Sequence, residues 1–217
     1  MGDITKDILC SSEEFKPLIN EHQVSFTTRI GAGRATYCKY KHSTGKIIIT
    51  YGKKMIASKH HPFEATQWLS YREIIKRNYF HANTSLSNLL AHTICHEFTH
   101  AIQQIQGLVF KGSIHNSHFY QILDQLHEAG LGEDVQQALD RQCKLHSINL
   151  TYNNREDDLL PVVTPVFQLY DKIQFKHRNK LITARIIKIN PKTLTVESKG
   201  LFKTTLWRVS KYRASHC

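Results

Sequence analysis

The longest helical pattern of apolar residues lies near the middle of the chain. Between Ser85 and Gln106, apolar residues recur every three or four positions, which is the period of one helix face. These residues are Leu86, Leu89, Leu90, Ile94, Phe98, Ala101, Ile102 and Ile105. Residues 83–85 offer N-cap side chains before this run, and Gly107 offers a stop after it. The pattern therefore predicts a buried helix over residues 85–106.

Weaker patterns predict further elements before and after this helix. Four other stretches have helical spacing, namely residues 5–22, 62–80, 119–129 and 133–145. Two strand-like runs, Arg34–Lys41 and Lys46–Tyr51, flank the turn signal His42–Gly45 and predict a β-hairpin. The edge strand of such a hairpin could hold an extended peptide by backbone pairing. Alternatively, the hairpin has only a structural role and completes the core. The sequence does not decide between these two roles.

The period changes to two in the last quarter of the chain. Strands are predicted over residues 172–176, 181–189, 193–197 and 204–209. This pattern favours a small SH3-like barrel, and its sequence is similar to Tudor- or KOW-type barrels. Residues 151–165 carry two prolines and predict a linker. We thus expect an α+β protein with a domain of helices and a small β-sheet over 1–150, a linker over 151–165 and a basic SH3-like β-barrel over 166–217.

The positive charge of the chain is concentrated in the predicted barrel. Residues 165–217 hold twelve Lys or Arg against two acids, whereas residues 1–164 hold seventeen against sixteen. This asymmetry predicts contact with a polyanion such as DNA, although a merely solvated basic face is the alternative. Basic residues interleaved with aromatic ones suit contacts to phosphates. The candidate nucleic-acid contacts are Lys176, Arg178, Lys180, Lys203, Arg208 and Arg213.

Cysteine usage and hydropathy bound the class of protein. The five cysteines include no C-x-x-C pair, so we expect neither a disulfide framework nor a four-cysteine zinc site. A reducing intracellular compartment, cytoplasmic or nuclear, fits this usage. No run approaches eighteen apolar residues and the N-terminus lacks the apolar region of a secretory signal. We therefore expect no membrane association.

The central helix carries the most specific motif of the chain, His96-Glu97-Phe98-Thr99-His100. Two histidines four residues apart lie on one helix face, so their imidazoles can converge on one Zn²⁺. Glu97 then stands beside the metal as a general base for a water molecule. The motif predicts a zinc metalloprotease with one catalytic zinc ion, a protein substrate and Glu97 as the catalytic residue. The alternative is a buried helix whose histidines are satisfied within the core.

Catalytic zinc requires a third protein ligand and one open coordination position. The elongated metzincin motif is absent, because Gln103 and Gln106 occupy its glycine and histidine positions. The nearest candidates for the third ligand are His115 and His118, which lie at a loop-to-helix junction. Spacing alone leaves the choice between them open. The candidates for stabilising an oxyanion are Tyr51, His118 and Tyr120.

Together these segments resemble the SprT-like (Spartan-like) zinc metalloproteases. The match consists of the helix motif His96–Ala101 followed, after a loop, by His115–Phe119 with its aromatic last position. The resemblance implies a zincin-like fold, with His96, His100 and His115 as metal ligands and Glu97 as general base. It also implies substrates that are DNA-associated or DNA-crosslinked proteins. Asn116 departs from the family's usual glycine.

Two other functions remain compatible with the sequence. One is a non-proteolytic nucleic-acid-binding module with a structural zinc site, which a fourth ligand such as His118 would close. The other is a peptidase whose barrel binds a protein partner through an aromatic cage in place of a basic surface.

Overall fold

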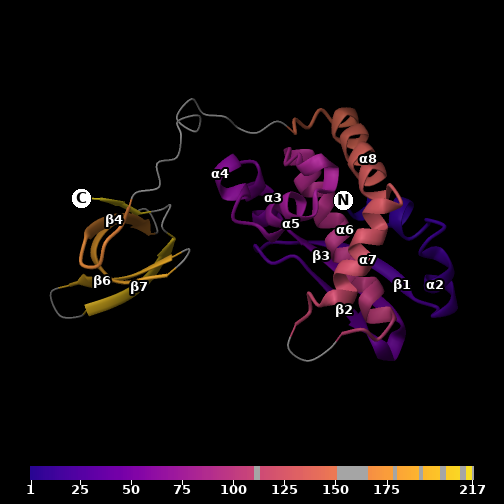
Figure 1. The fold of residues 1–217 in the computed structure, drawn as a ribbon, viewed down its shortest axis with the longest axis horizontal. Coiled ribbons are helices and arrows are strands. Elements are labelled where there is room, and N and C mark those ends of the chain that lie inside the picture. The colour runs from indigo at the N-terminus through magenta and orange to yellow at the C-terminus, as the bar shows by residue number, and fades with distance from the viewer. Residues whose placement is uncertain are drawn as a thin grey trace. The chain divides into compact units, whose positions relative to one another are not determined.

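The chain folds as an α+β protein with two separate β-sheets. The computed structural model describes residues 1–109, 113–150, 166–177, 180–190, 193–200, 204–210 and 214–216 (Figure 1). The chain divides into two compact units, which we call the first unit (Met1–Leu159) and the second unit (Leu160–Cys217). The predicted linker over 151–165 lies outside the described residues. Among those described, no helix is long and apolar enough to span a bilayer.

A three-stranded sheet of order β1-β3-β2 lies in the first unit. The predicted hairpin is confirmed, since β2 (Tyr37–Lys41) pairs antiparallel with β3 (Lys46–Gly52) around the short 3₁₀ turn η2 (His42–Thr44). The sequence pattern did not predict β1 (Ser25–Gly31), which pairs parallel with β3. Because β1 and β2 flank β3, strand β2 is an edge strand.

Ten further helical segments complete the described part of the first unit. They are α1 (Gly2–Ile4), the π-helical turn η1 (Thr5–Leu9), α2 (Lys16–Glu21), α3 (Lys53–Lys59), α4 (Pro62–Ala65), α5 (Leu69–Arg77), the 3₁₀ turn η3 (Tyr79–Ala82), α6 (Leu86–Ile105), α7 (Ser117–Glu128) and α8 (Leu131–Leu145). The single helices predicted over 5–22 and 62–80 are each divided. Pro17 opens α2, where its missing N–H costs nothing, and left-handed Asn78 ends α5.

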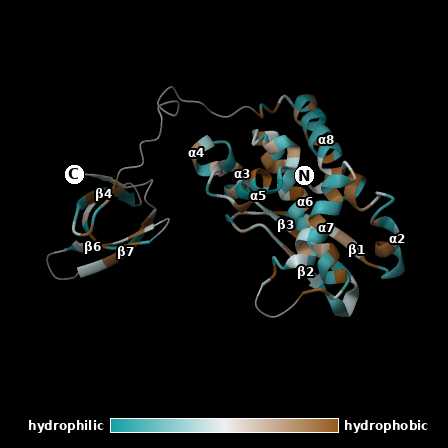
Figure 2. Cartoon of the chain, viewed as in Figure 1, coloured by the Kyte–Doolittle hydropathy of each residue, from teal (hydrophilic) through white to brown (hydrophobic). Residues whose placement is uncertain are grey.

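Helix α6 forms the centre of the first unit. It contacts α5, α7 and α8 as well as strands β2 and β3. Ser85 Oγ accepts a hydrogen bond from the N–H of Asn88 and caps its N-terminus. Leu89, Ile94 and Phe98 are fully buried, which confirms the predicted buried helix. By contrast, much of the α8 ribbon is teal in Figure 2, as expected of an amphipathic helix that packs against α6.

The chain passes from α5 to α6 through a strained turn. Asn78, Phe80, His81 and Ala82 all have φ between 50° and 58°, in the left-handed region that residues other than glycine rarely adopt. Each such residue costs on the order of 1 kcal/mol, so the surrounding structure must hold the turn. Tyr79 and Phe80 are buried, and Asn88 Nδ2 donates to the carbonyl of Asn83. The turn thereby fixes α5 against α6.

The second unit is a five-stranded antiparallel sheet of order β7-β6-β5-β4-β8. The four predicted strands are present as β4 (Lys172–His177), β5 (Lys180–Ile189), β6 (Thr193–Lys199) and β7 (Thr204–Ser210), and β8 (Ala214–His216) returns to pair with β4. The predicted closed barrel is not found among the described residues, where β7 and β8 are the two edges. Residue alternation specifies strands and their buried face, but closure depends on a pairing between the outer strands that alternation does not encode.

Candidate metal centre

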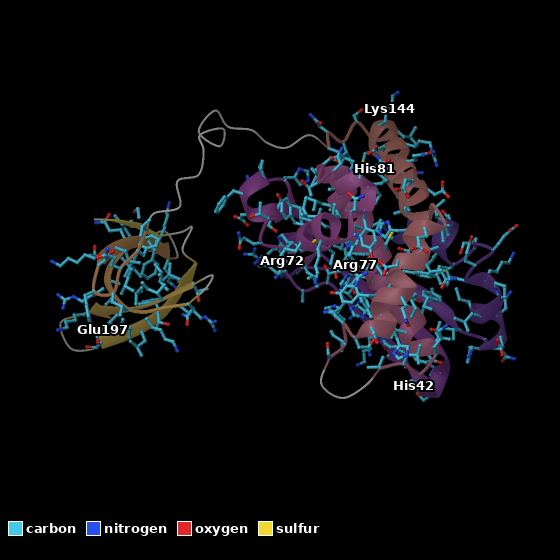
Figure 3. All side chains as sticks on the ribbon, in the orientation of Figure 1. His42, Arg72, Arg77, His81, Lys144 and Glu197 are labelled. Atoms are coloured by element: carbon cyan, nitrogen blue, oxygen red, sulfur yellow. The ribbon has the colours of Figure 1, made fainter. Side chains whose placement is uncertain are left out.

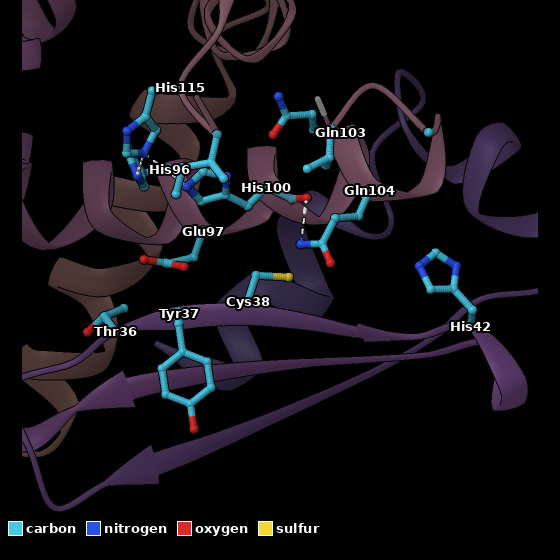
Figure 4. A pocket seen from close by; sticks show the side chains of 13 residues that line it. Thr36, Tyr37, Cys38, His42, His96, Glu97, His100, Gln103, Gln104 and His115 are labelled. Carbon is cyan, nitrogen blue, oxygen red and sulfur yellow. Dashed lines mark hydrogen bonds between the residues drawn. The ribbon is translucent and has the colours of Figure 1, made fainter. Parts of the chain in front are cut away.

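Three histidine side chains converge on one point beside α6. His96 and His100 project from α6, and His115 lies in the loop before α7. The Nε2 atom of His115 stands 3.1 Å from Nε2 of His96 and 3.1 Å from Nε2 of His100 (Figure 4). The structure therefore brings together the three residues that the sequence singles out as metal ligands, while His118 is not part of this cluster.

The spacing of the three nitrogens fits a bound zinc ion. Two nitrogens on one tetrahedral zinc, each at about 2.0–2.1 Å from the metal, stand about 3.3 Å apart. Hydrogen bonding alone does not explain the cluster, because Nε2 of His115 can donate a proton to only one of its two neighbours. Burial and the adjacent His96 and His115 lower the pKa of His100 to about 3. The His100 ring is thus neutral near pH 7, which is the form that binds a metal.

A carboxylate on α5 orients the first of these ligands. Glu73 Oε2 lies 2.9 Å from Nδ1 of His96 and 3.0 Å from Nε2 of His92. Burial alone would raise the pKa of Glu73, but the hydrogen bonds from His92 and His96 outweigh it and lower the pKa well below its ordinary value. An ionised Glu73 accepts the Nδ1 proton of His96, which leaves the lone pair of Nε2 available to a ligand at the centre of the histidine cluster.

The carboxylate also anchors a buried network that extends away from the metal site. His92 is fully buried, and its Nδ1 lies 3.1 Å from Nε2 of His127. The ring of His127 stacks on Tyr79 with centroids 3.8 Å apart, and the Tyr79 hydroxyl donates to Asp124 at 2.5 Å. His127 is half-buried, and its ring packs between His92 of α6 and Tyr79 of η3.

Replacement of Glu73 by Gln should weaken zinc binding by about 10- to 100-fold, since an outer carboxylate of this kind both orients its histidine and raises its basicity. Gln keeps the shape of the side chain but removes the charge. Competition against a chromogenic chelator measures the zinc affinity. Glu128→Gln, an exposed carboxylate on α7, is the matched control. An affinity equal in both variants would remove Glu73 from the metal site.

The loop that carries His115 is held by amide side chains. Gln103 Nε2 and the N–H of Phe119 both donate to Asn116 Oδ1 at 3.0 Å, and Asn116 Nδ2 donates to the carbonyl of Leu108. Asn116 thus caps α7 and ties the loop to the end of α6. Phe119 is fully buried, and its ring centroid lies within 4.9 Å of the centroids of all three imidazoles. The phenyl ring supports them from one side.

Glu97 is placed to exchange a proton beside the histidines. Its side chain is almost completely buried, and its Oε2 atom has no hydrogen-bond partner among the described residues. Burial raises the pKa of Glu97 to about 7, although the nearby His96 and Lys59 partly oppose this effect. A carboxylate with a pKa near neutrality both accepts and returns a proton at physiological pH. The unpaired oxygen keeps lone pairs that can accept a further hydrogen bond.

A cleft of about 570 Å³ runs between α6 and strand β2 past these residues. Figure 4 shows Glu97 pointing from α6 toward β2, with Thr36 near one end of the cleft and His42 near the other. The N–H of Tyr40 points away from β3 and donates to Gln104 Oε1 at 3.0 Å. In an antiparallel ladder, residues two apart face the same way, so the N–H and C=O of Cys38 also face the cleft. The edge of β2 therefore offers main-chain partners to an extended peptide.

The three oxyanion candidates lie in different places. Tyr51 is fully buried and shares a hydrogen bond with Thr5 Oγ1, so it does not face the cleft. His118 is half-buried at the start of α7. The ring centroid of Tyr120 lies 6.5 Å from that of His115, and the guanidinium of Arg77 covers its ring. Its side chain hydrogen-bonds with Glu73. None of the three candidates is among the described residues that line the cleft.

Several of the described basic residues of the second unit share one face of its sheet. Of the predicted nucleic-acid contacts, Lys176, Lys180 and Arg208 are exposed, whereas Arg178, Lys203 and Arg213 lie outside the described residues. Further basic residues lie on the same face. Lys172 of β4 pairs opposite Arg185 of β5. Lys188 of β5, Thr195 of β6 and Arg208 of β7 lie side by side across three strands. Lys172, Lys176, Arg185, Lys188 and Arg208 form what we call the basic face. Glu197, labelled in Figure 3, pairs opposite Arg185 on it.

Comparison with known proteins gave no match to a family model, to a curated protein or to a solved structure. The functional proposals therefore depend on the geometry and chemistry of the residues described above.

Proposed function

We propose that this chain is a zinc-dependent endopeptidase that acts on DNA-associated or DNA-crosslinked proteins. The observation that carries the proposal is the convergence of His96, His100 and His115 beside a buried Glu97 in one cleft. The resemblance of these segments to SprT-like proteases points the same way. A helix with its histidines below an edge strand also supports a zincin-like fold for the first unit.

The residues of the site divide the chemistry between them. A zinc ion held by His96, His100 and His115 would act as a Lewis acid and lower the pKa of a bound water toward about 7. Glu97 would accept a proton from the attacking water and return it to the leaving amine. The edge of β2 would hold the substrate backbone in an extended conformation. Glu73 would keep His96 in the tautomer that binds the metal.

The second unit is proposed as the DNA anchor. Five cations on the basic face contact phosphates without reading sequence, which suits an enzyme whose substrates are defined by their attachment to DNA. The return of β8 to β4 supports the SH3-like interpretation of this unit. The ring centroids of Trp207 and Phe175 lie 5.6 Å apart, and the Trp207 Nε1–H donates a hydrogen bond to Ser198 Oγ. This use of Trp207 in the core favours the basic face over an aromatic cage.

The proposed function is tested by metal analysis together with cleavage of casein and of histones, with and without DNA. We expect one zinc per chain, cleavage that a chelator abolishes, and faster cleavage of histones when DNA is present. Zinc without cleavage of any substrate would favour the structural zinc site instead. Cleavage that DNA does not change would favour a peptidase whose second unit binds a protein.

Removal of charge from the basic face should flatten the salt dependence of DNA binding. Each phosphate contact contributes about 0.9 to the slope of log K against log salt for duplex DNA. Replacing Lys172, Arg185, Lys188 and Arg208 by Gln should therefore reduce the slope by about 3 to 4. Fluorescence anisotropy over a salt series measures it. Gln at Lys16, Lys39, Lys53 and Lys54, which are exposed in the first unit, serves as control. Equal slopes in both variants would place the anchor elsewhere.

A further inference from the structure

A second cavity opens beside Glu97. It measures about 250 Å³ and shares Thr36, His96 and Glu97 with the main cleft. Arg34 and Lys59 also line it, together with apolar side chains that include Trp68. The volume suits one amino-acid side chain. Because the two cavities share residues at the catalytic position, a peptide in the main cleft would place one of its side chains in the second cavity.

Lys59 contributes a buried positive charge to this second cavity. Its side chain is 1% exposed, and Nζ donates to Ser70 Oγ at 2.7 Å, to the carbonyl of Leu89 at 3.1 Å and to Thr93 Oγ1. All three acceptors are uncharged. No carboxylate in the described part of the chain forms an ion pair with this ammonium. Glu97 and Glu73 attract this ammonium from a distance, but neither pairs with it directly. A buried charge without a directly paired counter-ion is costly, and a ligand of opposite charge relieves that cost.

Arg34 adds a second cation to the lining. Its guanidinium lies 5.5 Å from the ring centroid of Trp68 and 3.6 Å from a carboxylate oxygen of Glu64. Both members of that ion pair are substantially exposed, so solvent screens their attraction and the guanidinium can turn toward a bound ligand. The charges in the cavity lining are thus two cations and Glu97, which belongs to the catalytic centre.

The direction of β2 determines which substrate side chain meets this second cavity. Antiparallel pairing is the more stable arrangement per residue, so we expect a bound peptide to run antiparallel to β2. Its amino-terminal part would then lie toward His42 and its carboxyl-terminal part toward Thr36 (Figure 4). Thr36, Ala35 and Arg34 line the second cavity. The side chain that enters it therefore follows the bond held beside Glu97.

We propose that the second cavity is a specificity subsite for the residue on the carboxyl side of the scissile bond, and that Lys59 and Arg34 make it select an acidic side chain. This inference rests on the proposed peptidase function. A Glu or Asp side chain would place its carboxylate between the two cations, whereas a Lys or Arg side chain would meet like charge. Gln has nearly the same shape as Glu but carries no charge. A comparison of the two therefore reports the effect of the carboxylate charge.

The test uses the full-length zinc-loaded protein and three fluorogenic peptides. Their common sequence is taken from a casein site that the protein cuts, and they carry Glu, Gln or Lys immediately after the cleaved bond. We expect kcat/KM for the Glu peptide to exceed that for the Gln peptide by about tenfold, with the Lys peptide slowest. Assays at pH 6 keep Lys59 charged, since burial lowers its pKa to about 7.

Variants assign the preference to the two cations. Lys59→Met and Arg34→Gln should each lower the ratio of Glu to Gln cleavage by about threefold, since the two cations together account for the tenfold preference. Arg34 is exposed, so its variant decides the question if Lys59→Met does not fold. Lys54→Gln, an exposed lysine on the same helix as Lys59, should leave the ratio unchanged.

The outcomes separate this inference from the proposed function. A wild-type ratio near one, or a ratio that neither variant changes, would overturn the acidic subsite while leaving the peptidase in place. A zinc-loaded wild type that cuts neither casein nor any other protein offered would overturn the peptidase function and the subsite with it.

Discussion

Replacement of Glu97 by Gln is expected to reduce cleavage of casein by about 10³-fold while zinc stays bound, because general base catalysis contributes about 10²–10⁴-fold. Gln has the shape of Glu and leaves the three imidazoles untouched, but it cannot accept a proton from water. Burial raises the pKa of Glu97 to about 7, and a dication beside it would stabilise the charged form. The carboxylate would therefore be ready to act as base near neutral pH. Initial rates of casein cleavage, with zinc content measured on the same samples, test this result.

The matched control for Glu97→Gln is Glu128→Gln, which removes an exposed carboxylate from α7. It should retain full activity and one zinc per chain. Cleavage that persists in Glu97→Gln at the wild-type rate would show that Glu97 is not the base. Loss of zinc in that variant would mean that Glu97 acts on the metal site itself.

Replacement of His115 by Ala should abolish tight zinc binding, whereas His118→Ala should preserve it. His115 supplies the third nitrogen of the cluster, and His118 is not part of it. Loss of a direct ligand should cost more than the about 100-fold that outer residues cost. Zinc at 100 times its Kd stabilises a folded protein by about 2.7 kcal/mol. For a domain of this size the corresponding rise in Tm is about 5–11 °C.

The comparison of these two histidines needs only a thermal melt with and without added zinc. We expect the wild type and His118→Ala to show the rise in Tm, and His115→Ala to lack it. A rise retained in His115→Ala and lost in His118→Ala would exchange the roles of the two residues. A rise in neither variant would mean that the segment 115–118 supplies both ligands and closes the site, as in a structural zinc centre.

Local patterns predicted the centre of the first unit because its elements obey regular periods. The apolar period of 85–106 corresponds to α6, and the turn His42–Gly45 corresponds to the connection between β2 and β3. Strand β1 escaped prediction because its seven residues include no fully buried side chain. Its position depends on a parallel pairing with β3, which a local pattern does not specify.

For the metal site, the sequence identified the residues whose spacing follows from a helix, but not those that tertiary packing brings in. His96 and His100 lie one helical turn apart, so their proximity is local. Glu73 reaches His96 from a different helix, 23 residues earlier in the chain, and no spacing rule connects them. Lys59 stands beside two histidines in a polar stretch that resembles an exposed loop, yet it is buried. Such contacts follow from the packing of α3 and α5 on α6.

The hydrogen bond from the Tyr40 N–H to Gln104 limits the number of residues over which a peptide could form main-chain hydrogen bonds with β2. One donor of the strand edge is already occupied at that point, so main-chain pairing would stop after Cys38 and could not continue toward Lys41. Because so few main-chain hydrogen bonds would hold the peptide, cleaved fragments would dissociate quickly. The short pairing would also favour unfolded tails and loops over intact domains, because only a brief stretch of polypeptide has to be straightened.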